Sequence, residues 1–201
     1  MIGGLLRVLV IALIMLVAAL MLIPRPSEPE LATVLDEPRA LPAVALTDKH
    51  GAPFTLSEMA GKRVLLFFGF ANCPDVCPLT LAVLADVAER LRARVPAIAP
   101  EVVFISVDSE RDSPDRIRAY LAGFDENFFG ATADDATLSP LLAALGVSVH
   151  KQTVDGASYN VVHNGTIYVL DTQGRWTALF GGSEHSPDAI FNDYLILSRR
   201  R

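Results

Sequence analysis

Two cysteines four residues apart are the side chains of this sequence best suited to chemistry. They stand in the run Cys73-Pro-Asp-Val-Cys77 and are the only cysteines in the chain. Residues at positions i and i+4 share one face of a helical turn, so two sulfurs can point at one ion or at each other. Two thiolates are a soft ligand set that suits Cu(I) or zinc, but a structural zinc site normally has four protein ligands. We therefore expect the pair to bind a soft metal ion or to act as a redox couple.

The surrounding sequence places the pair where a strand becomes a helix. Residues 64–70 form a continuous apolar run, which is typical of a central strand covered on both faces. Pro78 fits a first helical turn, and apolar residues then recur at helical spacing up to about Arg94. A thiol at a helix start lies near the positive end of the helix dipole, which favours the thiolate. This edge of an open α/β sheet is also where ligands generally bind.

His163 is the candidate for a third metal ligand. It follows one expected strand and precedes another at residues 165–170. Two sulfurs and one imidazole would form a three-coordinate site, suited to a copper ion that must be handed on. His50, His150 and His185 are interpreted as surface or satisfied core residues. From the residues alone, the same interpretation remains open for His163.

The elements that must position these residues predict a mixed α/β domain. Strand and helix alternate from residue 64 to residue 124, which implies a parallel sheet at the core. Asp108 directly follows the second buried strand, at residues 102–107, and either stands beside the cysteine loop or caps a turn. The other expected elements are an N-terminal hairpin (43–46 and 54–56), helices (113–124, 134–145 and 187–197) and two further hairpins (147–152 with 158–162, and 165–170 with 176–180).

The N-terminal 40 residues are expected to lie outside this domain. Residues 5–23 are apolar except for Arg7, long enough for a transmembrane helix, and we interpret residues 1–23 as a retained membrane anchor rather than a cleaved signal peptide. Residues 24–40, rich in proline and acids, are expected to be an extended tether, leaving residues 41–201 as the folded domain. The net charge of -6 and the pI near 5.2 argue against a nucleic-acid partner.

The run from Phe67 to Pro78, Phe-Phe-Gly-Phe-Ala-Asn-Cys-Pro-Asp-Val-Cys-Pro, closely resembles the Sco/SenC family of copper chaperones. The likeness continues through residues 106–114, 124–132 and 159–174, and so covers nearly the whole domain. The resemblance implies a thioredoxin-like fold with an N-terminal hairpin and an inserted β-hairpin, preceded by one transmembrane helix. It also implies that Cys73, Cys77 and His163 bind copper.

By the same resemblance, the partner would be the copper-bearing subunit of cytochrome c oxidase. The protein would sit in the bacterial cytoplasmic (inner) membrane as a single-pass protein, with its domain facing the periplasm. Two positions beside the expected ligand depart from the family pattern. The family commonly has an acid before the ligand histidine and a hydroxyl residue after it, where this chain has Val162 and Asn164. An acid could orient the imidazole, so its absence bears on how the site is tuned.

Two other classes of function stay open. The same cysteines could cycle between dithiol and disulfide in a membrane-tethered thiol–disulfide oxidoreductase without a metal, so whether the protein is an enzyme is left open. The second class is a non-catalytic, membrane-tethered docking domain, in which the cysteines only brace a loop. A peroxiredoxin is disfavoured because Phe70 stands where its threonine would be. A haem attachment site is disfavoured because Pro78 follows Cys77 where a histidine is needed.

Overall fold

A computed structural model describes residues 10–11, 15, 28–155, 158–163, 165–182 and 185–199. The fold is built on one eight-stranded mixed sheet with the strand order β1-β10-β9-β4-β5-β6-β2-β3. A separate two-stranded sheet pairs β7 with β8. The strands are β1 (Thr33–Arg39), β2 (Leu46–Asp48), β3 (Pro53–Phe54), β4 (Val64–Gly69), β5 (Glu101–Ser106), β6 (Phe129–Thr132), β7 (Val149–Asp155), β8 (Ser158–His163), β9 (Ile167–Leu170) and β10 (Trp176–Phe180).

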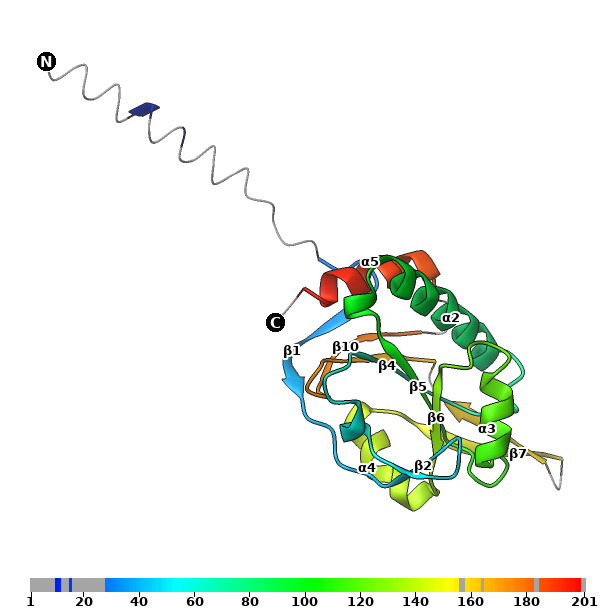
Figure 1. Ribbon diagram of the computed structural model, residues 1–201. Helices are drawn as coiled ribbons and strands as arrows, with labels where there is room; N and C mark the ends of the chain where they lie inside the picture. Colours follow the sequence, from blue (N-terminus) through cyan, green and yellow to red (C-terminus); the bar gives the residue numbers. More distant parts are fainter. Residues whose placement is uncertain are drawn as a thin grey trace, which may run out of the picture.

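The centre of the sheet confirms the predicted parallel core. β4 pairs in parallel with β5, and β5 pairs in parallel with β6, while β9 runs antiparallel to the other edge of β4. Every residue of β4 is buried. Helices cover one face of the sheet, and other segments of the chain lie over the opposite face (Figure 1). A strand buried on both faces reads as a continuous apolar run, which is why the sequence located it.

The helices are α2 (Val76–Arg94), α3 (Pro114–Leu121), α4 (Asp135–Leu145) and α5 (Pro187–Leu197), with short 3-10 turns η1 (Leu56–Met59) and η2 (Pro96–Ile98). α2 and α5 pack side by side over one face of the sheet, and α3 packs on β6, whereas α4 lies on the far side (Figure 1). The predicted helix signals are confirmed. Ser113 caps α3 by accepting from the Arg116 N–H at 3.3 Å, and Gly146 ends α4 with a φ of 69°.

The expected tether is wrong for residues 33–39, which form the edge strand β1. This strand pairs antiparallel with β10, and the Arg39 guanidinium lies 5.6 Å from the centre of the Trp176 ring. Pro38 is compatible with an edge strand, where one side of the backbone needs no partner. Just upstream, the buried Asp193 carboxylate of α5 accepts backbone N–H groups from Glu30, Leu31 and Ala32 at 2.6–2.8 Å. The ordered domain therefore begins before Leu41.

The expected membrane helix falls mostly on residues outside the described ranges. Of that segment, the structure describes Val10, Ile11 and Met15, which are helical and exposed. Within the described part of the chain, no helix combines the length and apolar character that a membrane crossing needs. The anchor at residues 1–23 stays a prediction.

Candidate metal centre

The cysteines occupy the loop between β4 and α2 and the first turn of that helix. The Cys73 N–H donates to the Phe70 carbonyl at 3.2 Å, and the Cys77 N–H donates to the Cys73 sulfur at 3.4 Å. Cys77 is fully buried and Cys73 is partly exposed. The two sulfurs thus lie close together as the sequence predicted, although Cys73 is in the loop before the Asp75 cap and only Cys77 is in the helix. One of them faces the core and the other is within reach of a partner.

The buried sulfur holds its proton more firmly than its place at a helix start suggested. A hydrogen bond with the Cys73 side chain raises the pKa of the Cys77 thiol, and burial raises it further. These effects outweigh the helix dipole, which we expected to favour the thiolate. A metal ion bound here must therefore displace a proton from Cys77.

Because of this raised pKa, we predict that the free energy of unfolding of the metal-free, reduced protein depends on pH. Because the unfolded thiol titrates near about 8.5, the unfolded state loses its proton above that pH while native Cys77 keeps its own. The free energy of unfolding should then fall as pH rises from 7 to 9.5, with a limiting slope of about 1.4 kcal/mol per pH unit. Urea titrations across this range measure it. Cys77→Ala should flatten the curve, and an equally steep curve in that variant would contradict the assignment to Cys77.

Gly69, the last residue of β4, lies against the buried sulfur. A Cβ atom added there would lie 2.9 Å from the Cys77 sulfur and 2.8 Å from the Phe104 ring. Both neighbours are fully buried and cannot move away freely. Glycine at this position therefore lets the helix start approach the strand closely.

Gly69→Ala should accordingly destabilise the protein by about 1–3 kcal/mol, because overpacking forces buried neighbours to shift. Gly181→Ala is the matched control, since an added Cβ would meet its nearest atom at 3.7 Å. Urea midpoints compare the two. A control variant that loses as much stability as Gly69→Ala would show that glycine flexibility, not the sulfur contact, governs the result.

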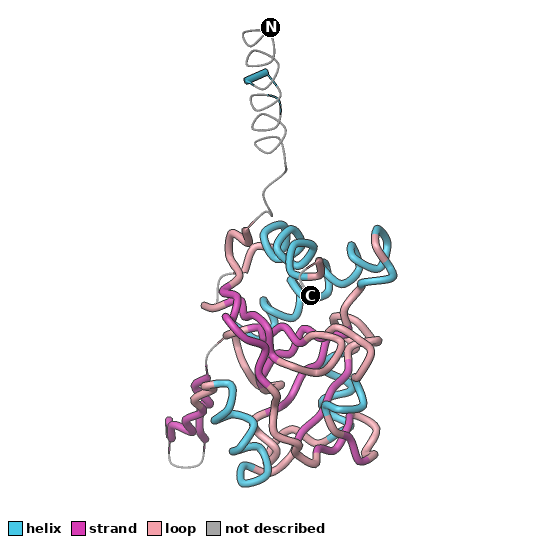
Figure 2. Tube along the Cα trace, turned by 90° about the vertical axis from the view of Figure 1, so that its left-hand side faces the viewer, coloured by secondary structure: helices cyan, strands magenta, loops and turns pink. Residues whose placement is uncertain are grey.

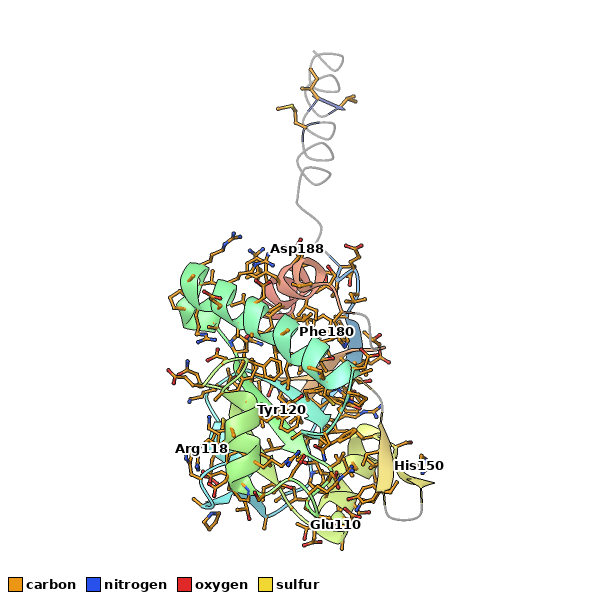
Figure 3. All side chains as sticks on the ribbon, turned by 90° about the vertical axis from the view of Figure 1, so that its right-hand side faces the viewer. Glu110, Arg118, Tyr120, His150, Phe180 and Asp188 are labelled. Atoms are coloured by element: carbon orange, nitrogen blue, oxygen red, sulfur yellow. The ribbon has the colours of Figure 1, made fainter. Side chains whose placement is uncertain are left out.

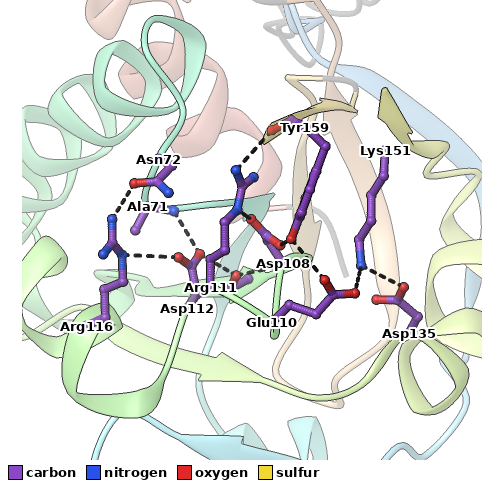
Figure 4. A network of polar contacts seen from close by, with 11 residues as sticks. Ala71, Asn72, Asp108, Glu110, Arg111, Asp112, Arg116, Asp135, Lys151 and Tyr159 are labelled. Atoms are coloured by element: carbon purple, nitrogen blue, oxygen red, sulfur yellow. Dashed lines mark hydrogen bonds and ion pairs between the residues drawn. The ribbon is translucent and has the colours of Figure 1, made fainter. Parts of the chain in front are cut away.

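Asp112 supports the cysteine loop through a hydrogen bond to its backbone. It was not identified as a site residue from the sequence. Its carboxylate is fully buried and accepts the Ala71 N–H at 2.8 Å and the Ser106 hydroxyl at 2.6 Å (Figure 4). Arg116 lies 3.5 Å from the other carboxylate oxygen and also donates to Asn72. The available signal was an acid directly before the α3 cap, but only the tertiary fold shows that it faces the loop.

Asp108 joins the turn after β5 to the hairpin. Its carbonyl accepts the Arg111 and Asp112 N–H groups at 3.0 and 2.9 Å, which fits the turn that was the second of its two expected roles. Its buried carboxylate accepts the Arg111 Nε–H at 2.5 Å and the Tyr159 hydroxyl at 2.6 Å. Burial and the hydrogen bond to Asp108 raise the pKa of Tyr159 to about 12, so its hydroxyl remains a donor at neutral pH. Arg111 and Tyr159 carried no sequence signal that we used.

His163 is the last residue of β8, where its backbone pairs with Val149 of β7. Its side chain lies outside the described residues, so its role as a ligand stays a prediction. Among the residues the structure describes, no group of three or more His, Cys, Asp and Glu side chains could hold a metal. Of the other histidines, His150 is exposed at the surface (Figure 3), and His50 is exposed as well. The His185 ring contacts the Gly165 carbonyl at 2.8 Å.

The donor set that the structure describes fits a soft ion. The two sulfurs lie close together at the start of α2. The nearby Asp108 carboxylate is bound by Arg111 and Tyr159, and one oxygen of the Asp112 carboxylate is bound by Ala71 and Ser106. Thiolates without carboxylates favour Cu(I) over magnesium or calcium.

Comparisons with known proteins agree with this chemistry. The SCO1/SenC family model matches residues 36–195. A Stutzerimonas stutzeri protein, named as a candidate copper-binding protein, is 33% identical over 144 residues, which cover 70% of this chain and 69% of that protein. The Bradyrhizobium japonicum ScoI structure with copper bound is 31% identical, with a TM-score of 0.68 over 78% of this chain and 98% of that one.

The apo Sco1 structure from Thermus thermophilus is 32% identical, with a TM-score of 0.75 over 86% of this chain and 99% of that one. These likenesses confirm the predicted mixed α/β, thioredoxin-like fold. They also confirm copper as the metal to be considered, since related structures were solved with copper bound.

Proposed function

This chain belongs to the SCO1/SenC family, whose members handle copper for cytochrome c oxidase, and we propose that it is a membrane-anchored copper-binding assembly factor. In this proposal it delivers copper to the copper-bearing subunit of the oxidase or prepares that subunit's cysteines. Cys73, Cys77 and His163 hold the Cu(I) cargo. Residues 1–23 anchor the protein in the bacterial cytoplasmic membrane, and the domain faces the periplasm.

The unequal exposure of the two sulfurs is the observation that carries the proposal. Cys77 is fully buried and packed against Gly69, so it can hold an ion from the protein side. Cys73 is partly exposed at the loop surface, so it can be exchanged for a thiolate of the recipient. A metal ion held in this way can leave by stepwise ligand exchange without unfolding of the domain.

The same geometry also supports thiol–disulfide exchange, the second candidate function. The exposed Cys73 thiolate would attack a disulfide of the recipient and release one recipient thiol, and Cys77 would then displace the other recipient sulfur from the mixed disulfide. The chain ends with a Cys73–Cys77 disulfide and the recipient with two thiols, so two electrons pass to the recipient. The sulfurs already interact directly, which makes the closing bond geometrically accessible.

One experiment separates the two functions. The full chain, reduced and loaded with Cu(I), is mixed with the soluble copper-site domain of the oxidase subunit in its dithiol form, and separately in its disulfide form. Copper in the dithiol recipient after separation supports delivery. Recipient thiols appearing with oxidised Cys73 and Cys77 support preparation. If neither product forms, the assembly role proposed here is wrong.

A further inference from the structure

The proposed metal site draws on two parts of the chain that do not share a sheet. The cysteines follow β4 in the main sheet, whereas His163 ends β8 in the separate two-stranded sheet. Figure 2 shows this hairpin as the magenta pair at the lower left, beside α4 and away from the central strands. Main-sheet hydrogen bonds therefore do not by themselves fix the distance between the hairpin and the cysteine loop. The short connection from His163 to Ile167 of β9 limits this distance, and side-chain contacts complete the attachment.

Arg111, in the segment between β5 and α3, lies between the two parts. Its guanidinium carbon is 4.0 Å from the centre of the Tyr159 ring on β8 and 5.8 Å from the centre of the Phe70 ring. Phe70 begins the cysteine loop, because its carbonyl accepts the Cys73 N–H. The Arg111 Nη1–H also donates to the Tyr159 carbonyl at 2.9 Å. One cation thus contacts both the start of the loop and the backbone of the hairpin.

Asp108 fixes both partners of this contact. The same buried carboxylate accepts from Arg111 with one oxygen and from the Tyr159 hydroxyl with the other (Figure 4). Its own position is set by the Ser106 hydroxyl, which accepts the Asp108 N–H at 3.2 Å at the end of β5. Hydrogen bonds to a buried, charged acceptor are stronger than neutral ones, so this is a firm attachment.

Lys151 on β7 makes a second, more solvated attachment. Its ammonium lies 2.8 Å from Glu110 and 3.0 Å from Asp135, and both carboxylates are largely exposed. Solvent screens such pairs, so we assign the main attachment to Asp108, Arg111 and Tyr159, which we call the Arg111 latch.

We propose that the Arg111 latch positions the hairpin that carries His163 against the cysteine loop, with Arg111 as a positioning residue for the metal site. Residues 159, 161 and 163 occupy alternate positions of one strand, and Val161 between them is buried, so a fixed Tyr159 determines where the end of β8 lies. This inference rests on the proposed function, because it takes His163 to be the third ligand.

A double-mutant cycle tests the latch in the reduced full chain. Cu(I) affinity is measured by competition with a chromophoric chelator for the wild type, Arg111→Gln, His163→Ala and the double variant. Arg111→Gln should weaken Cu(I) binding roughly 10- to 100-fold, the range found when a group that orients a ligand is removed. In the His163→Ala background it should have no further effect, because there is no imidazole left to position. Arg118→Gln, whose exposed side chain pairs with Asp115, is the matched control.

Amide hydrogen exchange of the metal-free variants gives a readout that does not depend on copper. Arg111→Gln should speed exchange in β7 and β8 and leave α2 unchanged. Equal weakening of copper binding in both backgrounds, or unchanged exchange in the hairpin, would overturn the latch. If the wild type binds no Cu(I), the proposed function fails together with the metal role of the latch. The exchange data then still show whether Arg111 holds the hairpin.

Discussion

Replacing Cys77 by serine should abolish retention of Cu(I) by the reduced protein. Cys77 is the buried half of the sulfur pair, and a neutral hydroxyl is a poor ligand for a soft ion. We expect the affinity for Cu(I) to fall by at least about 10³-fold, equivalent to about 4 kcal/mol of binding free energy. Competition with a chromophoric Cu(I) chelator measures the change, and circular dichroism checks that the variant is folded.

Thr80→Val is the control for the Cys77 variant. Thr80 is buried on the next turn of α2, and its hydroxyl has no hydrogen-bond partner among the described residues, so the change should cost little stability. It should leave copper binding intact. A Cys77→Ser protein that keeps wild-type affinity would show that the buried sulfur is not a ligand.

Asp112→Ala should be among the most destabilising single substitutions in the domain. The change removes a fully buried carboxylate and leaves the Ala71 N–H and the Ser106 hydroxyl without their acceptor. Burying these unpaired groups should lower the free energy of unfolding by about 3–5 kcal/mol. Urea denaturation of the reduced, metal-free protein measures the loss.

Asp115→Ala provides the comparison for Asp112→Ala. Asp115 lies three residues further along, is exposed, and pairs with Arg118 at 2.8 Å, so its loss should cost less than about 1 kcal/mol. Asp112→Asn should recover part of the stability, since the amide oxygen can still accept a hydrogen bond. Similar small losses for both alanine variants would mean that Asp112 does not hold the cysteine loop.

The sequence predicted those parts of the fold whose signals are local. β4 and β5 were found because strands buried on both faces are continuous apolar runs. α3 and α4 were found because Ser113 and Gly146 are the residues that helix ends favour. β1 was missed because an edge strand is largely exposed and can contain Pro38, so its composition resembles that of a linker.

The cysteine pair could likewise be predicted, because its spacing and its place after β4 are properties of the sequence. The side chains that support the cysteine pair could not be predicted from the sequence. Asp112, Arg111 and Tyr159 come together only through tertiary contacts among the turn after β5, the cysteine loop and the hairpin. Apart from the place of Asp112 directly before the α3 cap, nothing in the local sequence distinguishes them from ordinary surface charges and aromatics. The raised pKa of Cys77 was also beyond the sequence, since it follows from the hydrogen bond with the Cys73 side chain and from burial.

The copper content and X-ray absorption spectrum of the reduced chain, measured beside His163→Ala, test the central claim most directly. The proposed site predicts one tightly held Cu(I) per chain, coordinated by the two cysteine sulfurs and one nitrogen, with the nitrogen lost in the variant. No copper retained under reducing conditions would contradict the claim and leave the cysteine pair as a thiol–disulfide couple.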